Sequence, residues 1–176
     1  ATVDKNFTVI DRRAGRISGD LSKLEKAVNE IDIGIDFEFK HTIDHRGTLV
    51  LRGANSIVTD TDPHKENVKV LKSKPASSRI THPANRRPKA HGSKPIAAIV
   101  NNFTKQCYAK LSKLELNKGR KLPANMILLR GAGLYKKVPS FFEMHNLKGA
   151  AIATVALVKG VAKFCGLDII DVEGAT

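Results

Sequence analysis

Residues 73–94 form a long segment that has little capacity to enter a folded core. The segment is rich in proline and serine and contains one large aliphatic residue, Ile80. A stretch with so little apolar surface cannot bury enough of it to offset the entropy lost on ordering the chain. We therefore predict a long mobile loop at 73–94, and the sequence before and after it must supply the fold.

Before this loop, a strand and an amphipathic helix are expected in succession. Residues 7–10 are apolar and β-prone, and they lead into a turn at 11–16. Ser18 or Asp20 can then cap a helix. The apolar residues of that helix recur at three- and four-residue spacing, as on one buried face: Leu21, Leu24, Val28 and Ile31.

A hairpin and a short edge strand are expected next. Residues 35–40 alternate strictly between apolar and charged side chains, which is the period of a half-buried strand. Residues 48–52 form a second β-prone run, and the polar segment 44–47 joins the two. We predict a hairpin here, followed by a short strand at 68–71 on the edge of a sheet.

After the loop, helix and strand patterns alternate. Pro95 suits the first turn of a helix, whose apolar face continues through Cys107 to Leu114 and places Cys107 in the core. The segments that follow predict, in order, a strand at 126–129, a helix beginning with a capping box at 140–143, a strand at 150–153, a helix at 155–164 that Gly166 closes, and a strand at 168–172. This alternation indicates an α/β fold, to which the hairpin adds α+β character in the N-terminal half.

Length, cysteine content and hydropathy restrict the class of protein. The 176 residues suffice for a single domain, which we expect to hold one mixed β-sheet flanked by helices. No apolar run approaches the roughly 20 residues of a membrane span, and the first residues do not resemble a signal peptide. Cys107 and Cys165 offer neither a disulfide framework nor a four-ligand zinc site. We expect a cytoplasmic protein, and the absence of an initial Met indicates a piece of a longer chain.

The basic residues are concentrated in the middle of the chain. The net charge is +13, and residues 67–114 carry 11 basic and no acidic side chains. The loop at 73–94 is thus either an electrostatic funnel for an anionic partner or a solvated linker. A basic nucleic-acid-binding module is a rival interpretation, but aromatic residues are only 5% and Trp is absent, so no base-stacking platform is evident.

An arginine cluster lies between the first strand and the first helix. Arg12, Arg13 and Arg16 flank Gly15, which allows the backbone to turn. A guanidinium group offers paired donors that match phosphate or carboxylate oxygens, and it stays charged at any working pH. The cluster therefore suits an anion, although surface solubility or pairing with Asp11 explains the same residues.

Two further arginines follow apolar strands. Arg52 and Arg130 each precede a glycine at the end of such a run, and strand ends of this kind project side chains into the cleft beside a sheet. Each is a candidate ligand residue, and a capping or ion-pair role is the alternative.

The segment 60–64 (DTDPH) places two carboxylates and an imidazole close together. Asp62 and His64 suit a metal, a proton shuttle or a binding loop for hydroxyl groups, whereas an Asx-turn before the proline explains much of the composition. His45 and Arg46 in the predicted hairpin turn are similarly ambiguous. No glycine-rich phosphate loop, dinucleotide fingerprint or nucleophile elbow is present, so the sequence shows no evident catalytic machinery.

Taken in order, these motifs resemble the archaeal-type cofactor-independent phosphoglycerate mutases. The resemblance rests on residues 1–4 (ATVD), 11–17 (DRRAGRI), 60–64 (DTDPH), 100–104 (VNNFT), 122–133 (LPANMILLRGAG), 139–141 (PSF), 149–153 (GAAIA) and 172–176 (VEGAT). It extends from one end of the chain to the other. The one departure is the loop at 73–94, which is unusually basic for the family and leaves the roles of Arg79, Arg86 and Arg87 open.

The resemblance implies a part of an isomerase of glycolysis and gluconeogenesis. The family belongs to the alkaline-phosphatase-like superfamily, in which a phosphatase domain carries two divalent metal ions (Mn, Mg, Zn or Co) and a Ser or Thr nucleophile. This chain resembles the substrate-binding insert, residues 1–176, that closes over that domain, so the phosphatase domain is absent and the isolated chain is expected to be inactive. The implied reaction interconverts 3-phosphoglycerate and 2-phosphoglycerate through a phosphorylated nucleophile.

The resemblance also gives the candidate residues a shared substrate. Phosphoglycerate carries a phosphate and a carboxylate, so its site needs several arginines. On this interpretation Arg12, Arg13, Arg16 and Arg130, with Arg52, bind the anionic groups, while Asp62 and His64 orient hydroxyls or relay a proton. His45 and Arg46 complete the expected set of substrate-binding residues. The expected partners are phosphoglycerate and the missing phosphatase domain, with neither nucleic acid nor membrane. A related phosphotransferase of the same superfamily, acting on another small phosphorylated acid, is the remaining alternative.

Overall fold

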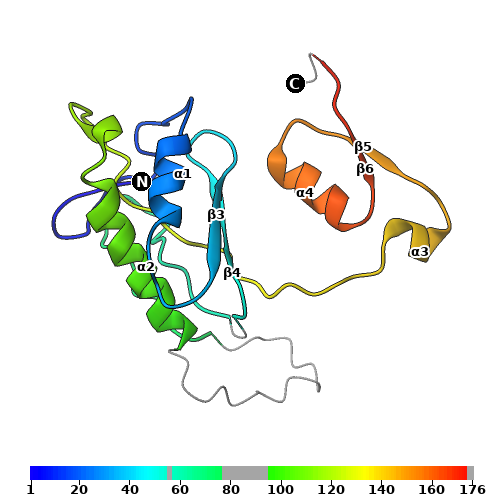
Figure 1. The fold of residues 1–176 in the computed structure, drawn as a ribbon, viewed down its shortest axis with the longest axis horizontal. Coiled ribbons are helices and arrows are strands. Elements are labelled where there is room, and N and C mark those ends of the chain that lie inside the picture. Colours follow the sequence, from blue (N-terminus) through cyan, green and yellow to red (C-terminus); the bar gives the residue numbers. More distant parts are fainter. Residues whose placement is uncertain (55–56, 77–94, 174–176) are drawn as a thin grey trace. The chain divides into compact units, whose positions relative to one another are not determined.

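The chain folds into two compact units, Ala1–Leu134 and Tyr135–Thr176, in a computed structural model (Figure 1). The structure describes residues 1–54, 57–76 and 95–173. Most of the predicted loop at 73–94, with Arg79, Arg86 and Arg87, therefore lies outside the described residues. None of the described helices has the length and apolar character needed to cross a membrane.

The first unit contains two antiparallel strand pairs and two α-helices, of which the second is the longer. Strand β1 (Thr2–Val3) pairs with β2 (Val9–Asp11), and β3 (Phe37–His41) pairs with β4 (Gly47–Leu51) in the predicted hairpin. The helices are α1 (Ser22–Asn29) and α2 (Ile96–Leu111), and a short 3-10 helix, η1, covers Glu115–Asn117. The predicted strand at 7–10, the hairpin and both helices of this unit are confirmed within a few residues.

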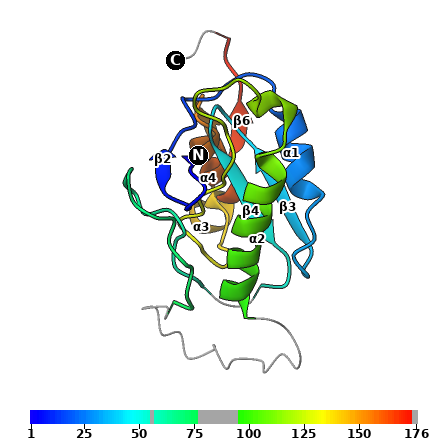
Figure 2. The same cartoon turned by 90° about the vertical axis from the view of Figure 1, so that its left-hand side faces the viewer.

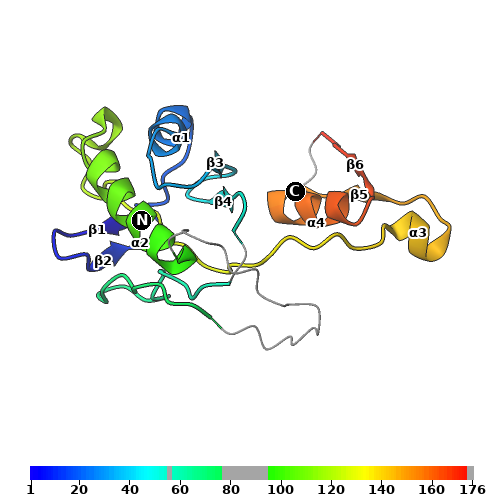
Figure 3. The same ribbon diagram turned by 60° about the horizontal axis from the view of Figure 1, so that its bottom comes forward.

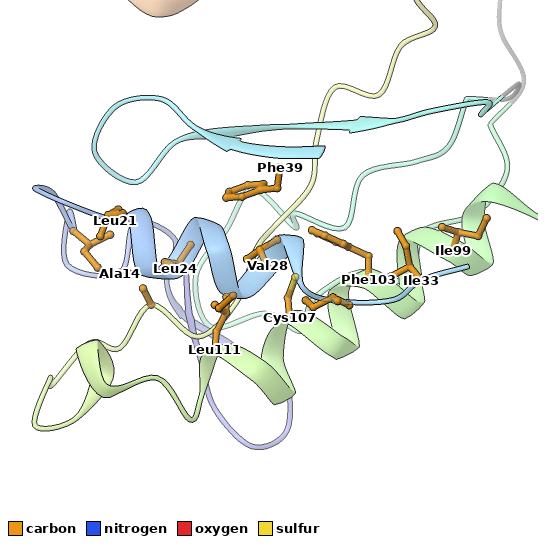
Figure 4. Packing of buried hydrophobic residues seen from close by; sticks show 14 residues of the cluster. Ala14, Leu21, Leu24, Val28, Ile33, Phe39, Ile99, Phe103, Cys107 and Leu111 are labelled. Carbon is orange, nitrogen blue, oxygen red and sulfur yellow. The ribbon is translucent and has the colours of Figure 1, made fainter. Parts of the chain in front are cut away.

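Helix α2 contributes to hydrophobic clusters on two of its sides. On one side Phe103 and Cys107 pack against α1 and the β3–β4 hairpin, where Phe39 points toward α1 (Figure 4). On the other side Tyr108 joins the cluster formed by the β1–β2 pair, which lies across α2 from α1 (Figures 2 and 3). The burial of Cys107 is as predicted, and loss of hydration raises the pKa of its thiol far above the usual value.

Neither predicted capping residue occupies the N-cap of α1, which is Leu21 and makes no side-chain capping bond. The Asp20 carboxylate accepts a hydrogen bond from the backbone N–H of Ser22 at 2.9 Å, which satisfies one free donor of the first turn. Asp20, the residue before the N-cap, thus supports the first turn by this one bond.

The expectation of one mixed sheet is wrong, although the mixed α/β class is confirmed. The described strands form three separate two-stranded sheets, two antiparallel and one parallel. The predicted strand at 126–129 would have joined them, but it pairs with no full strand. Its backbone bonds instead to the N-terminal residue and, at Leu129, to Thr61 and Asp62. Residues 67–70 likewise make only a few backbone bonds to residues 7–9 in place of an extended edge strand.

The second unit is a strand–helix–strand motif preceded by a short helix. Strands β5 (Ala150–Ile152) and β6 (Asp168–Ile170) are parallel and are connected by α4 (Ala156–Phe164). Helix α3 (Phe141–His145) begins with the predicted capping box between Ser140 and Glu143. Gly166 follows α4 with a φ of +77°, and an added Cβ would lie 2.8 Å from the side chain of Ser140, so glycine is required there.

The second unit buries little of its own apolar surface. Ala162 is the one hydrophobic residue of its described part that is buried. On α4, Leu157 is 74% exposed and Val161 is 55% exposed, and Ile152 of β5 is 63% exposed. The cover on both faces that parallel strands usually have is therefore not provided by this unit itself.

Candidate functional site

The turn that follows β2 is fixed by its own acidic residue. The Asp11 carboxylate accepts hydrogen bonds from the backbone N–H groups of Arg13 (2.7 Å) and Gly15 (3.1 Å). Ala14, Gly15 and Arg16 have φ values of +50°, +64° and +54°, and the Ala14 side chain is completely buried in the main core. A left-handed conformation at three successive residues is rare and must be held by its surroundings. The buried alanine is thus an anchor for a turn that carries three guanidinium groups.

The facing loop, residues 60–66, is joined to this turn by an ion pair. Arg12 donates to Asp62 from Nε (3.1 Å to Oδ1) and from Nη2 (2.5 Å to Oδ2). The Asp62 side chain is only 6% exposed. Burial by itself raises the pKa of Asp62, but the hydrogen bonds from Arg12 and from the His64 backbone outweigh it, so the pKa lies below its ordinary value. The same pairing raises the pKa of Arg12. Asp62 therefore positions Arg12.

Two carboxylates hold His64. Its backbone N–H donates to Asp62 Oδ1 (2.8 Å), and its ring Nε2 lies 3.0 Å from Asp60 Oδ2. The residue adopts a φ of +58°, a conformation that a side chain other than glycine or asparagine takes up only when contacts hold it. The second oxygen of Asp60 accepts a hydrogen bond from the backbone N–H of Gly131 (3.0 Å). Asp60 therefore connects His64 to the segment that ends with Arg130.

The turn and the loop enclose a concavity of about 400 Å³ that is rich in positive charge. Its lining residues are Asp11, Arg12, Arg13, Arg16, His64, Lys65 and Glu66. Among the described residues, neither Arg13 nor Arg16 lies within ion-pair distance of a carboxylate. Unpaired guanidinium groups in a concavity are well suited to an anion with several oxygens, such as a phosphate or a carboxylate. We call this hollow the arginine concavity.

A second hollow of about 700 Å³ is also lined by His64. Its lining residues are Thr59, Asp60, Asp62, His64, Leu71, Lys72 and Lys74. His64 is the residue that the two hollows share. We call it the lysine concavity. The sequence did not predict these two lysines as site residues, because Lys74 falls in the predicted mobile loop and Lys72 lies between that loop and the predicted strand at 68–71. The signal that was present is a small polar residue, Ser73, between two lysines in an extended stretch.

The structure brings some of the other predicted residues near this site and places one elsewhere. His45 is half-buried at the hairpin turn, where burial first, and then the charges of Arg46 and Arg13, lower its pKa. It lies close enough to Arg13 to feel that charge, but neither His45 nor Arg46 lines either concavity. Arg130 is exposed, beside the Gly131 that bonds to Asp60.

Arg52 does not project into either concavity. Its guanidinium pairs with Asp36 (3.4 Å) and Glu38 (2.8 Å) on the neighbouring strand of the hairpin. The ion-pair alternative for this residue is therefore the one that the geometry supports.

The carboxylates of the DTDPH segment are engaged in hydrogen bonds within the protein. Among the described residues, no three His, Cys, Asp or Glu side chains are grouped as metal ligands would be. Asp62 is bonded to Arg12, and Asp60 is bonded to His64 and Gly131, so these carboxylates act as hydrogen-bond acceptors within the protein.

Comparison with known sequences gives one family. The family profile described as 2,3-bisphosphoglycerate-independent phosphoglycerate mutase matches residues 1–117. The chain is 44% identical over 184 residues to 2,3-bisphosphoglycerate-independent phosphoglycerate mutase 1 of Methanocaldococcus jannaschii, and 38% identical over 186 residues to the corresponding protein of Sulfolobus acidocaldarius. Each match covers 100% of this chain and 42% of the relative. The chain thus spans less than half the length of these relatives.

Comparison with solved structures agrees. A cofactor-independent phosphoglycerate mutase from Thermoplasma acidophilum matches 98% of this chain, and 45% of its own length, with a TM-score of 0.66 and 31% identity. The PH0037 protein of Pyrococcus horikoshii matches 97% of this chain, and 38% of its own length, with a TM-score of 0.60 and 25% identity.

Proposed function

Because the chain belongs to the 2,3-bisphosphoglycerate-independent phosphoglycerate mutase family, we propose that it supplies the substrate-binding part of a larger phosphoglycerate mutase. The reaction interconverts 3-phosphoglycerate and 2-phosphoglycerate by moving the phosphoryl group to a nucleophile of the enzyme and back to the other oxygen of the glycerate. The nucleophile and two divalent metal ions belong to the remainder of the enzyme. The residues of this chain hold and orient the substrate.

The observation that carries this proposal is the arginine concavity. Arg13, Arg16 and His64 line one hollow, and neither arginine is within ion-pair distance of an acidic side chain among the described residues. Their paired N–H donors match the oxygens of a phosphate or a carboxylate, and phosphoglycerate has both groups. Arg12 is held in place by Asp62, so its charge stays at the edge of the hollow. This pre-positioning reduces the entropy lost when an anion binds.

His64 is suited to contact a substrate hydroxyl. Its Nε2 bonds to Asp60, whereas its Nδ1 lies 4.0 Å from Asp62 Oδ2, which is too far for a hydrogen bond. With the proton on Nε2, Nδ1 is free to accept the proton of a hydroxyl group that lies between the two concavities. Asp60 fixes both the tautomer and the direction of the ring, and it acts as a positioning residue.

The second unit supports the proposed partner, the remaining part of the mutase chain. Parallel sheets are usually covered on both faces, and a two-stranded sheet is at best marginally stable alone. The exposed apolar residues of α4 and β5, of which Leu157 and Ile152 are the most exposed, thus require a cover. We propose that residues 1–134 hold the substrate and that residues 135–176 dock onto the phosphatase domain of the same polypeptide. On this proposal the 1–176 insert has one part that binds substrate and another part that contacts the phosphatase domain.

Binding of 3-phosphoglycerate to residues 1–176, measured by titration calorimetry, tests the proposal. Arg13→Gln and Arg16→Gln should each weaken binding by about ten-fold, the loss of roughly one charge-assisted hydrogen bond. Arg52→Gln is the matched control, because it removes an arginine that is already paired with Asp36 and Glu38. It should change the affinity by less than about two-fold. Equal losses in all three variants, or unchanged binding in the first two, would show that the arginine concavity is not the site.

A reaction assay tests where the chemistry lies. Residues 1–176 alone should leave 3-phosphoglycerate unconverted, because the proposed nucleophile is outside this chain. Formation of 2-phosphoglycerate by the purified chain would contradict the assignment.

A further inference from the structure

The lysine concavity has no role in the site as described so far. We propose that Lys72 and Lys74 form a second anion-binding arm, so that the two concavities take the two ends of one ligand that carries two anionic groups. This inference rests on the proposed function and identifies residues that set its specificity for a ligand with two charged ends.

The backbone geometry of residues 72–74 presents both lysines on the same side. In an extended segment, residues two positions apart point in the same direction and the residue between them points in the opposite one. Ser73, the intervening residue, is 2% exposed, whereas Lys72 and Lys74 are exposed and line the hollow. The segment therefore has a buried side and a charged side.

Two sets of hydrogen bonds hold this segment in place. The Asn101 side chain of α2 accepts from the Ser73 N–H (2.9 Å) and donates to the Ser73 carbonyl (2.9 Å). The Ser73 hydroxyl donates to the Thr59 carbonyl (2.7 Å), and the Thr59 hydroxyl accepts from the Lys74 N–H (2.9 Å). The Thr59 N–H in turn donates to the Lys74 carbonyl (2.9 Å). The backbone that carries the lysines is thus fixed to a helix on one side and to an extended segment on the other.

The two lysines of the lysine concavity do not pair with its two carboxylates. Its two carboxylates already have partners, since Asp62 is bonded to Arg12 and Asp60 to His64 and Gly131. Within the described part of the chain, neither Lys72 nor Lys74 is within ion-pair distance of an acidic side chain. An ammonium group is a compact charge on a flexible stem, so it adapts to either a carboxylate or a phosphoryl group.

The shared residue gives the order of contacts along the ligand. His64 lines both hollows, so a ligand that spans them passes its ring. Phosphoglycerate carries its phosphoryl and carboxylate groups on a three-carbon backbone that also bears a hydroxyl. The two charged ends then face the arginines and the lysines, and the hydroxyl lies nearest His64.

The test compares ligands with one and two anionic groups. Calorimetry would give the affinity of residues 1–176 for 3-phosphoglycerate, for glycerol 3-phosphate, which lacks the carboxylate, and for glycerate, which lacks the phosphoryl group. The quantity of interest is the affinity for 3-phosphoglycerate divided by the higher of the other two affinities. We call this ratio the advantage of 3-phosphoglycerate. In K72Q/K74Q this advantage should fall by about ten-fold, as for loss of one charge-assisted hydrogen bond. The control K113Q/K118Q removes the same charge from surface residues outside both concavities and should leave the advantage unchanged.

The outcomes separate this inference from the proposed function. If R13Q and R16Q weaken 3-phosphoglycerate binding but K72Q/K74Q leaves the advantage intact, the lysine arm is wrong and the arginine site stands. If no variant changes binding, or the chain binds none of the three ligands, both proposals fail. An equal loss in K72Q/K74Q and K113Q/K118Q would show a general charge effect and would overturn the lysine arm. Amide NMR spectra verify that each variant is folded, and the single variants K72Q and K74Q replace the double one if it is not.

Discussion

Replacement of Asp62 by asparagine removes the charge that positions Arg12 while preserving the size of the side chain. The wild-type carboxylate accepts three hydrogen bonds, two from the Arg12 guanidinium and one from the backbone N–H of His64. The Asp62 side chain is 6% exposed and that of Arg12 is 27% exposed. Asp62→Asn therefore leaves a largely buried guanidinium without its counter-charge.

The cost of this change follows from the burial of the pair. Removal of one partner of a fully buried ion pair destabilises a protein by about 3–5 kcal/mol. Arg12 retains some contact with water, which screens the orphaned charge, so we expect a loss of about 2 kcal/mol in the free energy of unfolding. The double variant with Arg12→Gln should recover part of that loss, because it removes the unpaired charge.

Urea unfolding at a series of pH values measures this effect and its sign. The pKa of folded Asp62 lies below the reference value of 3.8, so the ionised carboxylate stabilises the folded state at every pH above that value. This contribution is lost as the pH falls through the folded pKa. The difference between wild type and D62N should thus be constant from about pH 5 to pH 8 and shrink below about pH 4. A difference smaller than about 0.5 kcal/mol at pH 7, the scale of an ordinary surface substitution, or one that grows with acid, would refute the reasoning.

Two further predictions concern the lysine arm and the division of the chain. Asn101→Ala removes both hydrogen bonds to Ser73 without changing any charge, and it should reduce the advantage of 3-phosphoglycerate over ligands with one anionic group. Asn102→Ala, on the same helix, is the control and should leave that advantage unchanged. Calorimetry measures both variants. Residues 1–134 alone should remain folded, since the hydrophobic clusters lie within them, and should bind 3-phosphoglycerate as residues 1–176 do. An unfolded or non-binding 1–134 would contradict the assignment of substrate binding to the first unit.

Local patterns in the sequence predicted the elements whose stabilising contacts are near in the chain. The apolar spacing from Leu21 to Val28 matches α1, and the alternation at 35–40 with the run at 48–52 matches the hairpin. The capping box at Ser140 is present as its sequence predicts, because both of its hydrogen bonds form within four residues. These features depend on periodicity and on short-range hydrogen bonds, which a sequence displays directly.

Contacts distant in the sequence account for the errors. The run at 126–129 has the composition of a buried strand, but Asn125 bonds through its side chain to both the N–H and the carbonyl of Val3, and the chain that follows meets residues 61–62. No local pattern specifies those partners. For the same reason the sequence did not predict the two hydrogen bonds between the Asn101 side chain and the Ser73 backbone, which lie 28 residues apart.

The ion-pair alternative for Arg52 follows from the predicted hairpin itself. In the hairpin, Phe37 lies opposite Leu51, so the next pair outward is Asp36 with Arg52. Opposite charges that face each other across two strands attract, and the pairing of Arg52 follows from the register alone. The arginines of the 11–16 turn have no such local partner, and their convergence with His64 depends on the loop at 60–66.

The most direct test of the central claim is the position of bound 3-phosphoglycerate on residues 1–176, mapped by NMR. Titration should shift the side-chain Nε–H signals of Arg13 and Arg16 and the ring signals of His64, and it should leave Arg52 unaffected. Shifts confined to other surfaces, or no shifts at these three residues at saturating ligand, would contradict the claim that this concavity holds the substrate.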